Sequence, residues 1–78
     1  MKTNVLLIGG RSKAKSLATS LIRNGYHVTA VNDTYEDCVE LAAIDEITVI
    51  NGDGTKPFVL EDAGAGDADI AIALTSKD

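Results

Sequence analysis

Apolar residues occur in short runs that alternate with segments of helical spacing. The first run, residues 4–8, is continuously apolar after Asn4, which is typical of a strand that is covered on both faces in a parallel sheet. Residues 27–31, 47–50 and 68–74 form three further mostly apolar runs. We therefore predict four strands at these positions.

The segment between the first two runs has the periodicity of a helix with one apolar face. Apolar residues stand at i, i+3, i+4, i+7 and i+8, which are Ala14, Leu17, Ala18, Leu21 and Ile22. Ser12 is placed to be the N-cap of this helix, and Asn24-Gly25 supplies the left-handed residue that ends it.

Two shorter helices are predicted between the remaining strands. Thr34 is placed as an N-cap, and Asp37 follows three residues later, close to a capping box. Pro57 suits the first turn of the last helix, which Gly64 ends after Ala63. The buried stripe of the middle helix is expected to consist of Cys38, Leu41 and Ala42.

This strand–helix alternation predicts an α/β fold, a Rossmann-like doubly wound parallel sheet of four strands in the order 3-2-1-4. A full dinucleotide fold continues beyond a fourth strand, and an apolar edge strand invites pairing. We therefore expect residues 1–78 to be the N-terminal part of a longer domain, or another chain to cover this edge.

Composition excludes several classes of function. The formal net charge of -5 argues against a nucleic-acid-binding surface and against an electrostatic membrane anchor, since both need basic patches. One cysteine and one histidine cannot build a zinc site, and a lone cysteine fits a reducing compartment. The apolar runs near the start are too short for a signal peptide or a membrane span, so we expect a cytoplasmic protein.

The turn after the first strand is the main candidate for chemistry. A dinucleotide fingerprint reads G-x-G-x-x-G, and here the corresponding residues are Gly9, Arg11 and Ala14. Arg11 replaces the glycine that lets a pyrophosphate approach, yet Arg11 and Lys13 beside a helix N-terminus favour an anion. Two readings stay open: phosphate contact at this turn, or a simple turn with Arg11 pointing to water.

Two further polar positions follow the second and third strands. The acid that holds ribose hydroxyls in such folds is replaced by Asn32, and Asp33 either substitutes for it or begins the next helix. An acid here would repel a 2′-phosphate, which favours NAD-type or simple adenine nucleotides over NADP. In the Gly52–Thr55 loop, Asp53 either accepts a hydrogen bond from adenine or satisfies its own backbone.

Several segments together resemble a known family. The glycine turn, the Gly52-Asp53-Gly54-Thr55 loop and the stretch from Asp62-Ala63-Gly64 through Ala68-Asp69 to Ala73-Leu74-Thr75 are similar to the TrkA-N domain, also called RCK or KTN, of potassium-uptake regulators. The resemblance covers nearly the whole chain.

The resemblance implies a regulatory, gating subunit of a Trk/Ktr-type potassium transporter, without enzymatic activity. Such domains bind NAD(H) or ATP/ADP, assemble as dimers or rings, and act on the cytoplasmic face of a membrane transporter subunit. Carried onto this sequence, phosphates would meet Gly9, Gly10, Arg11, Ser12 and Lys13; ribose would meet Asn32 and Asp33; adenine would lie near Asp53 and Thr55; and Leu74 and Thr75 would border the cleft.

Two departures from the family pattern, Arg11 and Asn32, keep alternatives open. One is a Rossmann scaffold that has lost its nucleotide. The other is an NAD-dependent dehydrogenase domain, because the apolar start and glycine pair also resemble the enzyme of sirohaem synthesis. Against an enzyme, His27 lies at the wrong end of its strand, and Cys38 is expected in the core.

Overall fold

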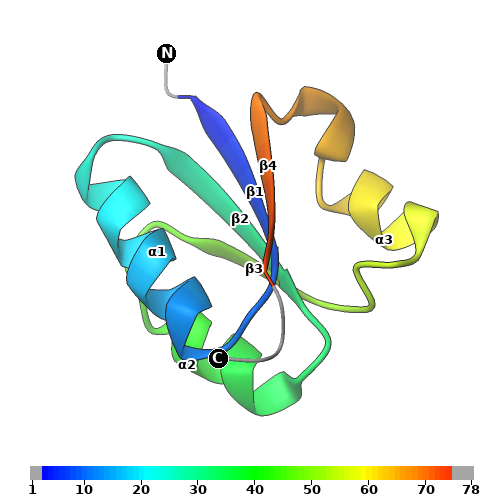
Figure 1. Ribbon diagram of the computed structural model, residues 1–78, viewed down its shortest axis with the longest axis horizontal. Coiled ribbons are helices and arrows are strands. Elements are labelled where there is room, and N and C mark those ends of the chain that lie inside the picture. Colours follow the sequence, from blue (N-terminus) through cyan, green and yellow to red (C-terminus); the bar gives the residue numbers. More distant parts are fainter. Residues whose placement is uncertain (1–2, 75–78) are drawn as a thin grey trace.

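A four-stranded parallel sheet in the order β3-β2-β1-β4 forms the centre of the fold (Figure 1). The computed structural model describes residues 3–74. Within them the strands are β1 (Asn4–Gly9), β2 (His27–Asn32), β3 (Thr48–Asn51) and β4 (Ile70–Leu74). Every neighbouring pair is parallel, so the carboxyl ends of the strands lie at one edge of the sheet. The predicted fold class and strand order are confirmed.

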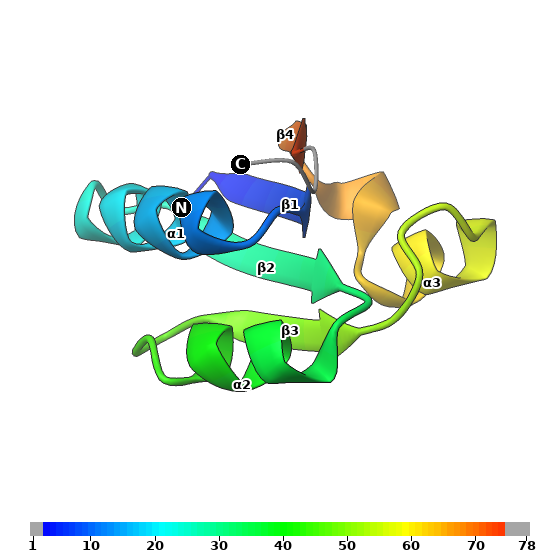
Figure 2. The ribbon, with the colours of Figure 1, turned by 60° about the horizontal axis from the view of Figure 1, so that its bottom comes forward.

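Helices cover both faces of this sheet. They are α1 (Ser12–Arg23), α2 (Tyr35–Ala42), α3 (Pro57–Asp62) and a short 3₁₀ helix, η1 (Ala65–Asp67). Figures 1 and 2 show α1 and α2 together on one face, while α3 and η1 lie on the other. The chain therefore changes face between β3 and β4, which makes the sheet doubly wound.

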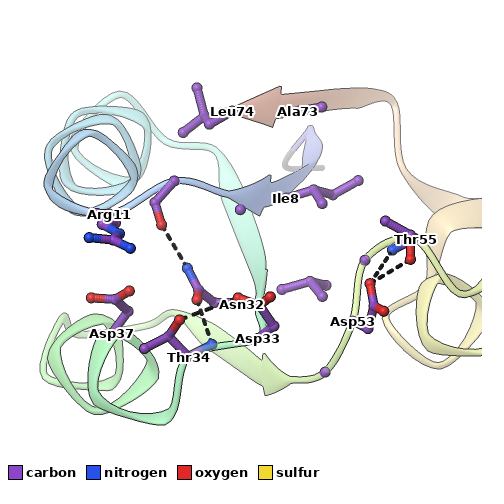
Figure 3. A pocket seen from close by; sticks show the side chains of 15 residues that line it. Ile8, Arg11, Asn32, Asp33, Thr34, Asp37, Asp53, Thr55, Ala73 and Leu74 are labelled. Carbon is purple, nitrogen blue, oxygen red and sulfur yellow. Dashed lines mark hydrogen bonds between the residues drawn. The ribbon is translucent and has the colours of Figure 1, made fainter. Parts of the chain in front are cut away.

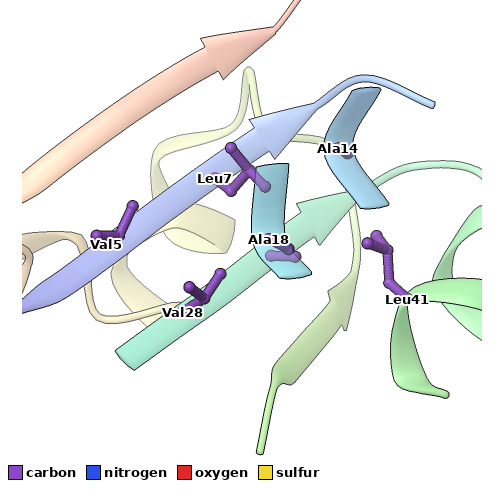
Figure 4. Packing of buried hydrophobic residues seen from close by; sticks show 7 residues of the cluster. Val5, Leu7, Ala14, Ala18, Val28 and Leu41 are labelled. Atoms are coloured by element: carbon purple, nitrogen blue, oxygen red, sulfur yellow. The ribbon is translucent and has the colours of Figure 1, made fainter. Parts of the chain in front are cut away.

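Alternating side chains of β1 serve the two faces, which explains why its sequence is continuously apolar. Val5 and Leu7 belong to the cluster under α1 and α2, whereas Leu6 packs with Val31 and Val59 on the α3 side. Figure 4 shows the first cluster; its fully buried members are Val5, Leu7, Ala14, Ala18, Val28, Ala30 and Leu41. Burying each Val or Leu side chain contributes roughly 1.5–3 kcal/mol to folding.

Most helix ends follow the sequence signals. Gly25 has a φ of 90° just after α1, and Gly64 has a φ of 81° after α3, so both adopt the left-handed conformation that ends a helix. Pro57 is the first residue of α3, where its missing N–H costs no hydrogen bond. Thr34 is the N-cap of α2, as predicted, although its side chain makes no capping bond to any described residue.

Two predicted details of the helices are wrong. Arg11, not Ser12, is the N-cap of α1, because the Arg11 carbonyl oxygen accepts the first helical hydrogen bonds and Ser12 is already helical. Ala42 is exposed rather than buried. The buried residues of α2 are Cys38 and Leu41, and the half-buried Ile44 continues their spacing of three just after the helix, which leaves Ala42 outside.

The fourth strand begins later than predicted, at Ile70. The η1 turn precedes it, and the Asp69 N–H donates to the Asn4 carbonyl oxygen at 2.9 Å. In return, the Asn4 N–H donates to Asp69 Oδ2 at 2.8 Å, so this aspartate fixes the start of the pairing with β1. Among residues 3–74, β4 pairs only with β1, and Ile70 keeps 42% of its surface exposed. The expected apolar edge is present.

Candidate functional site

A cleft of about 590 Å³ lies at the carboxyl ends of the strands (Figure 3). It opens where the chain leaves β1 toward one face of the sheet and arrives from the other face at β4. Such a switch point is the usual ligand position in open α/β sheets. The cleft is lined by Ile8, Gly9, Gly10, Arg11, Val31, Asn32, Asp33, Thr34, Asp37, Gly52, Asp53, Gly54, Thr55, Ala73 and Leu74.

Two consecutive glycines turn the chain from β1 into α1. Gly9 and Gly10 have φ values of 76° and 80°, which L side chains rarely adopt. A Cβ on Gly9 would lie 2.8 Å from the Leu74 carbonyl oxygen, and one on Gly10 would lie 2.9 Å from Leu74 Cδ1 and 3.2 Å from Ala14 Cβ. The turn therefore has no room for side chains, and it exposes bare backbone to the cleft.

Positive charge surrounds the start of α1. Arg11 is exposed and lines the cleft, and Lys13 and Lys15 are exposed in the first turn of the helix, which contains no acidic residue. Cations at a helix N-terminus oppose the helix dipole, so they are better explained by an anion than by helix stability. Of the predicted phosphate contacts, Ser12 and Lys13 lie outside the cleft lining.

Asn32 is the most constrained polar residue of the site. Its side chain is buried, with 3% of its surface exposed. Its Nδ2 donates to the Gly10 carbonyl oxygen at 2.9 Å, and its Oδ1 accepts the Thr34 N–H at 2.9 Å. The amide expected to meet ribose is therefore bound to the backbone on both sides.

Asp33 and Asp37 bring negative charge to the same cleft. Asp33 is exposed, and its Oδ1 accepts a 3.3 Å hydrogen bond from the Thr34 hydroxyl. Asp37 is half-buried in the first turn of α2, and Figure 3 shows it and Arg11 on opposite sides of the opening. An exposed carboxylate at the end of β2 is suited to accept hydrogen bonds from hydroxyl groups.

Asp53 stabilises its own loop. Its Oδ1 accepts the Thr55 N–H at 2.8 Å and the Thr55 hydroxyl at 2.6 Å, an Asx turn in which backbone and side chain close on one oxygen. The hydrogen bonds from the Thr55 hydroxyl and N–H, with a smaller effect of Lys56, lower the pKa of Asp53. Asp53 is exposed and lines the cleft, and both hydrogen bonds from Thr55 go to Oδ1.

Two further predicted site residues, Leu74 and Thr75, lie at the end of the fourth strand in sequence. Leu74 is half-buried, lines the cleft and limits the space at Gly10, whereas Thr75 lies outside the described residues. Sequence reasoning did not assign Ile8, Val31, Thr34, Asp37, Gly52, Gly54 or Ala73 to the site. Most of them lie next to the end of a strand or the start of a helix at this edge. That position is the sequence feature from which they could have been assigned to the site.

Cys38 and His27 do not line the cleft. Cys38 is buried, and its Sγ donates to the Asn32 carbonyl oxygen at 3.4 Å. Burial, together with the nearby Asp37 and Asp33, raises the pKa of this thiol, which keeps it protonated and weakly nucleophilic. His27 begins β2, at the end of the sheet opposite the cleft, as the sequence predicts.

Residues 3–74 hold no group of three His, Cys, Asp or Glu side chains arranged to bind a metal ion. In the same residues, no helix has the length and apolar character needed to span a bilayer.

Comparison with known proteins gives consistent matches. The family model for the TrkA-N domain matches residues 5–78. The chain is 31% identical over 74 residues to the Trk system potassium uptake protein TrkA of Vibrio alginolyticus, which covers 95% of this chain and 16% of that protein. It is 34% identical over 74 residues to the TrkA homolog of Methanothermobacter thermautotrophicus, covering 95% of this chain and 34% of that protein. The chain thus spans only a minor part of the length of these relatives.

The glycine turn yields a prediction about stability. Gly10→Ala should cost more than Gly25→Ala, although both residues have positive φ. At Gly25 the new Cβ meets no described atom within 4 Å, so only backbone strain of about 1–2 kcal/mol is expected. At Gly10 the contacts with Leu74 and Ala14 add about 1–3 kcal/mol. Urea denaturation followed by circular dichroism measures both variants, and equal losses would contradict the packing argument.

The Asp53 loop yields a prediction about pH. Because folding lowers the pKa of Asp53, its stabilising effect is complete above the unfolded pKa of about 3.9 and is lost as the pH falls through the folded value. The stability difference between wild type and Asp53→Asn should be constant near neutrality and shrink below about pH 4. Chemical denaturation from pH 2.5 to pH 7 tests this. A difference that does not change with pH would show that the charge of the Asp53 carboxylate is not its source.

Proposed function

The chain belongs to the TrkA-N domain family, and from this we propose that it is the nucleotide-sensing part of a regulatory subunit of a potassium transporter. The relatives that it matches are named as Trk system potassium uptake proteins. The observation that carries the proposal is the cleft at the strand ends, whose floor is a glycine turn without side chains. A flat, anionic ligand needs such a backbone surface.

The phosphates of the ligand would lie over Gly9 and Gly10, with Arg11 at the rim and the first turn of α1, including Ser12 and Lys13, beyond it. Backbone N–H groups at a helix start and nearby cations together favour this position for an anion. The basic first turn, which lacks acids, supports the phosphate reading over that of a simple turn.

The ribose would be held mainly by Asp33. Its carboxylate is exposed in the cleft, whereas the Asn32 side chain is bound to the backbone at both of its polar atoms. Adenine would lie at the far end of the cleft, beside Asp53 and Thr55. There, Oδ2 of Asp53 could accept a hydrogen bond from the adenine amino group. Leu74 and Thr75 would border the ligand near β1.

Charge narrows the choice of ligand. Three carboxylates line the cleft, those of Asp33, Asp37 and Asp53, and Arg11 is the only cation in the lining described. A further phosphate on the ribose would come close to Asp33, so NAD(H) or ATP/ADP are preferred over NADP. No catalytic step is part of this proposal.

Regulation follows if ligands differ in their affinity for two states of an assembly. A nucleotide can shift such an equilibrium only by the difference between its binding free energies for the two states. We place the chain in a homo-oligomer, a dimer or a ring, at the cytoplasmic face of a membrane potassium transporter subunit. The exposed apolar edge at β4 is available for contacts with the remainder of such a protein.

Calorimetric titration with NADH, NAD, ATP and ADP tests nucleotide binding. We expect saturable binding of at least one ligand. Asp33→Asn and Asp53→Ala should each weaken it about tenfold, because each removes a charged hydrogen-bond acceptor worth roughly 1.5–3 kcal/mol. Asp45→Asn is the control, since Asp45 is exposed but lies outside the cleft lining. Absence of binding at millimolar ligand would favour a scaffold that has lost its nucleotide.

Potassium uptake tests the regulatory role. The complete gene that contains this domain should restore nucleotide-dependent rubidium or potassium uptake to cells that lack their Trk regulatory subunit. Gly10→Ala, whose new Cβ would crowd Leu74 and Ala14 and displace the glycine turn, should reduce this rescue, whereas Gly66→Ala should not, because a Cβ there meets no described atom within 4 Å. Full uptake in cells that lack both their own regulatory subunit and the introduced gene would argue against this role. Equal rescue by the two variants would also argue against it.

A further inference from the structure

We propose that Asn32 is a positioning residue, whose side chain holds the glycine turn in the conformation that receives the ligand's phosphates. In this role the amide cannot be replaced by the carboxylate that usually ends the second strand of such folds. The inference rests on the proposed function for its ligand, and on the geometry of residues 3–74 for the rest.

The side chain of Asn32 joins two segments that are far apart in sequence. Nδ2 donates to the carbonyl oxygen of Gly10, 22 positions earlier, and Oδ1 accepts from the N–H of Thr34 (Figure 3). One bond needs a donor and the other needs an acceptor. An amide in a single orientation satisfies both, and the burial of Asn32 excludes water as a substitute for either partner.

The main chain of Asn32 is anchored as firmly as its side chain. Its carbonyl oxygen accepts the Gly52 N–H at 2.9 Å, Asn51 Nδ2 at 3.1 Å and Cys38 Sγ at 3.4 Å. These donors come from α2, from the end of β3 and from the loop after it. The amide thus extends from a fixed base, which is what a residue needs in order to position another segment.

The glycine turn needs such support. Gly9 and Gly10 have no side chains to pack, and glycine loses more conformational freedom on folding than any other residue. The N-cap of α1, Arg11, makes no side-chain capping bond to any described residue. The bond from Asn32 is thus a side-chain hydrogen bond that ties the turn to the end of β2.

A carboxylate at this position would break the link. An ionised Asn32→Asp side chain could still accept the Thr34 N–H, but it has no proton for the Gly10 carbonyl oxygen and would repel it. Asp33 and Asp37 also line this cleft and would add repulsion, with Arg11 opposing them from the rim and the neutral Cys38 thiol packed beneath. The residue that is standard elsewhere is thus expected to be harmful here.

Titration of wild type, Asn32→Asp and Asn32→Ala with NADH, NAD, ATP and ADP, from pH 8 to pH 4, which reaches the ordinary aspartate pKa of about 3.9, tests the proposal. At pH 8 both variants should bind about tenfold more weakly or worse, the effect of losing one such bond. Affinity of Asn32→Asp should recover as its carboxyl takes up a proton, because the new O–H can donate to Gly10. Asn32→Ala should show no such recovery relative to wild type. Asn24→Asp, at the exposed end of α1, controls for the added charge.

Binding by Asn32→Asp at pH 8 that equals or exceeds that of wild type would overturn the proposal. If wild type binds none of the four nucleotides, the proposed function fails, but the link is still measurable by NMR. The Asn32 side-chain amide should then exchange slowly with solvent in wild type, and the amide signals of Gly10 and Arg11 should broaden in Asn32→Asp. Rapid exchange in wild type would show that the link does not exist.

Discussion

The close approach of α1 to the sheet is the constraint on which the rest of the structure depends. Ala14 and Ala18 are completely buried against β1 and β2, and a Cβ at Gly10 would crowd Ala14. Small residues at these points bring the helix start down onto the strand ends. As a result the chain must turn through two glycines, and the floor of the cleft consists of backbone alone.

Much of the fold was predictable, because its elements are defined by local patterns. The continuous apolar character of residues 5–8 reflects strand faces buried under different helices, and the spacing of residues in α1 reflects its one buried side. The failures also have local causes. Ser12 was a reasonable N-cap by residue type, but the conformation of Arg11 decides where the helix begins. Ala42 was misplaced because α2 packs at intervals of three residues.

The site was predictable in position but not in the roles of its polar residues. The carboxyl ends of parallel strands always share one edge, so Gly10, Asn32 and Asp53 could be brought together from sequence. The orientation of the Asn32 amide depends on Gly10, 22 positions away, and no spacing rule reveals it. The Asx turn at Asp53 spans only two residues, and the sequence had already offered it as one of two readings.

Charge in the cleft makes the shape of the turn more important than any single cation. Arg11 faces three lining carboxylates, so the described lining offers an anion no net positive field. An anionic group would then depend on N–H groups directed at it from the turn and the first turn of α1. Such bonds weaken steeply when distance or angle is wrong. In the proposed nucleotide site, the residue that sets the geometry of the turn would therefore influence affinity as strongly as a residue in direct contact.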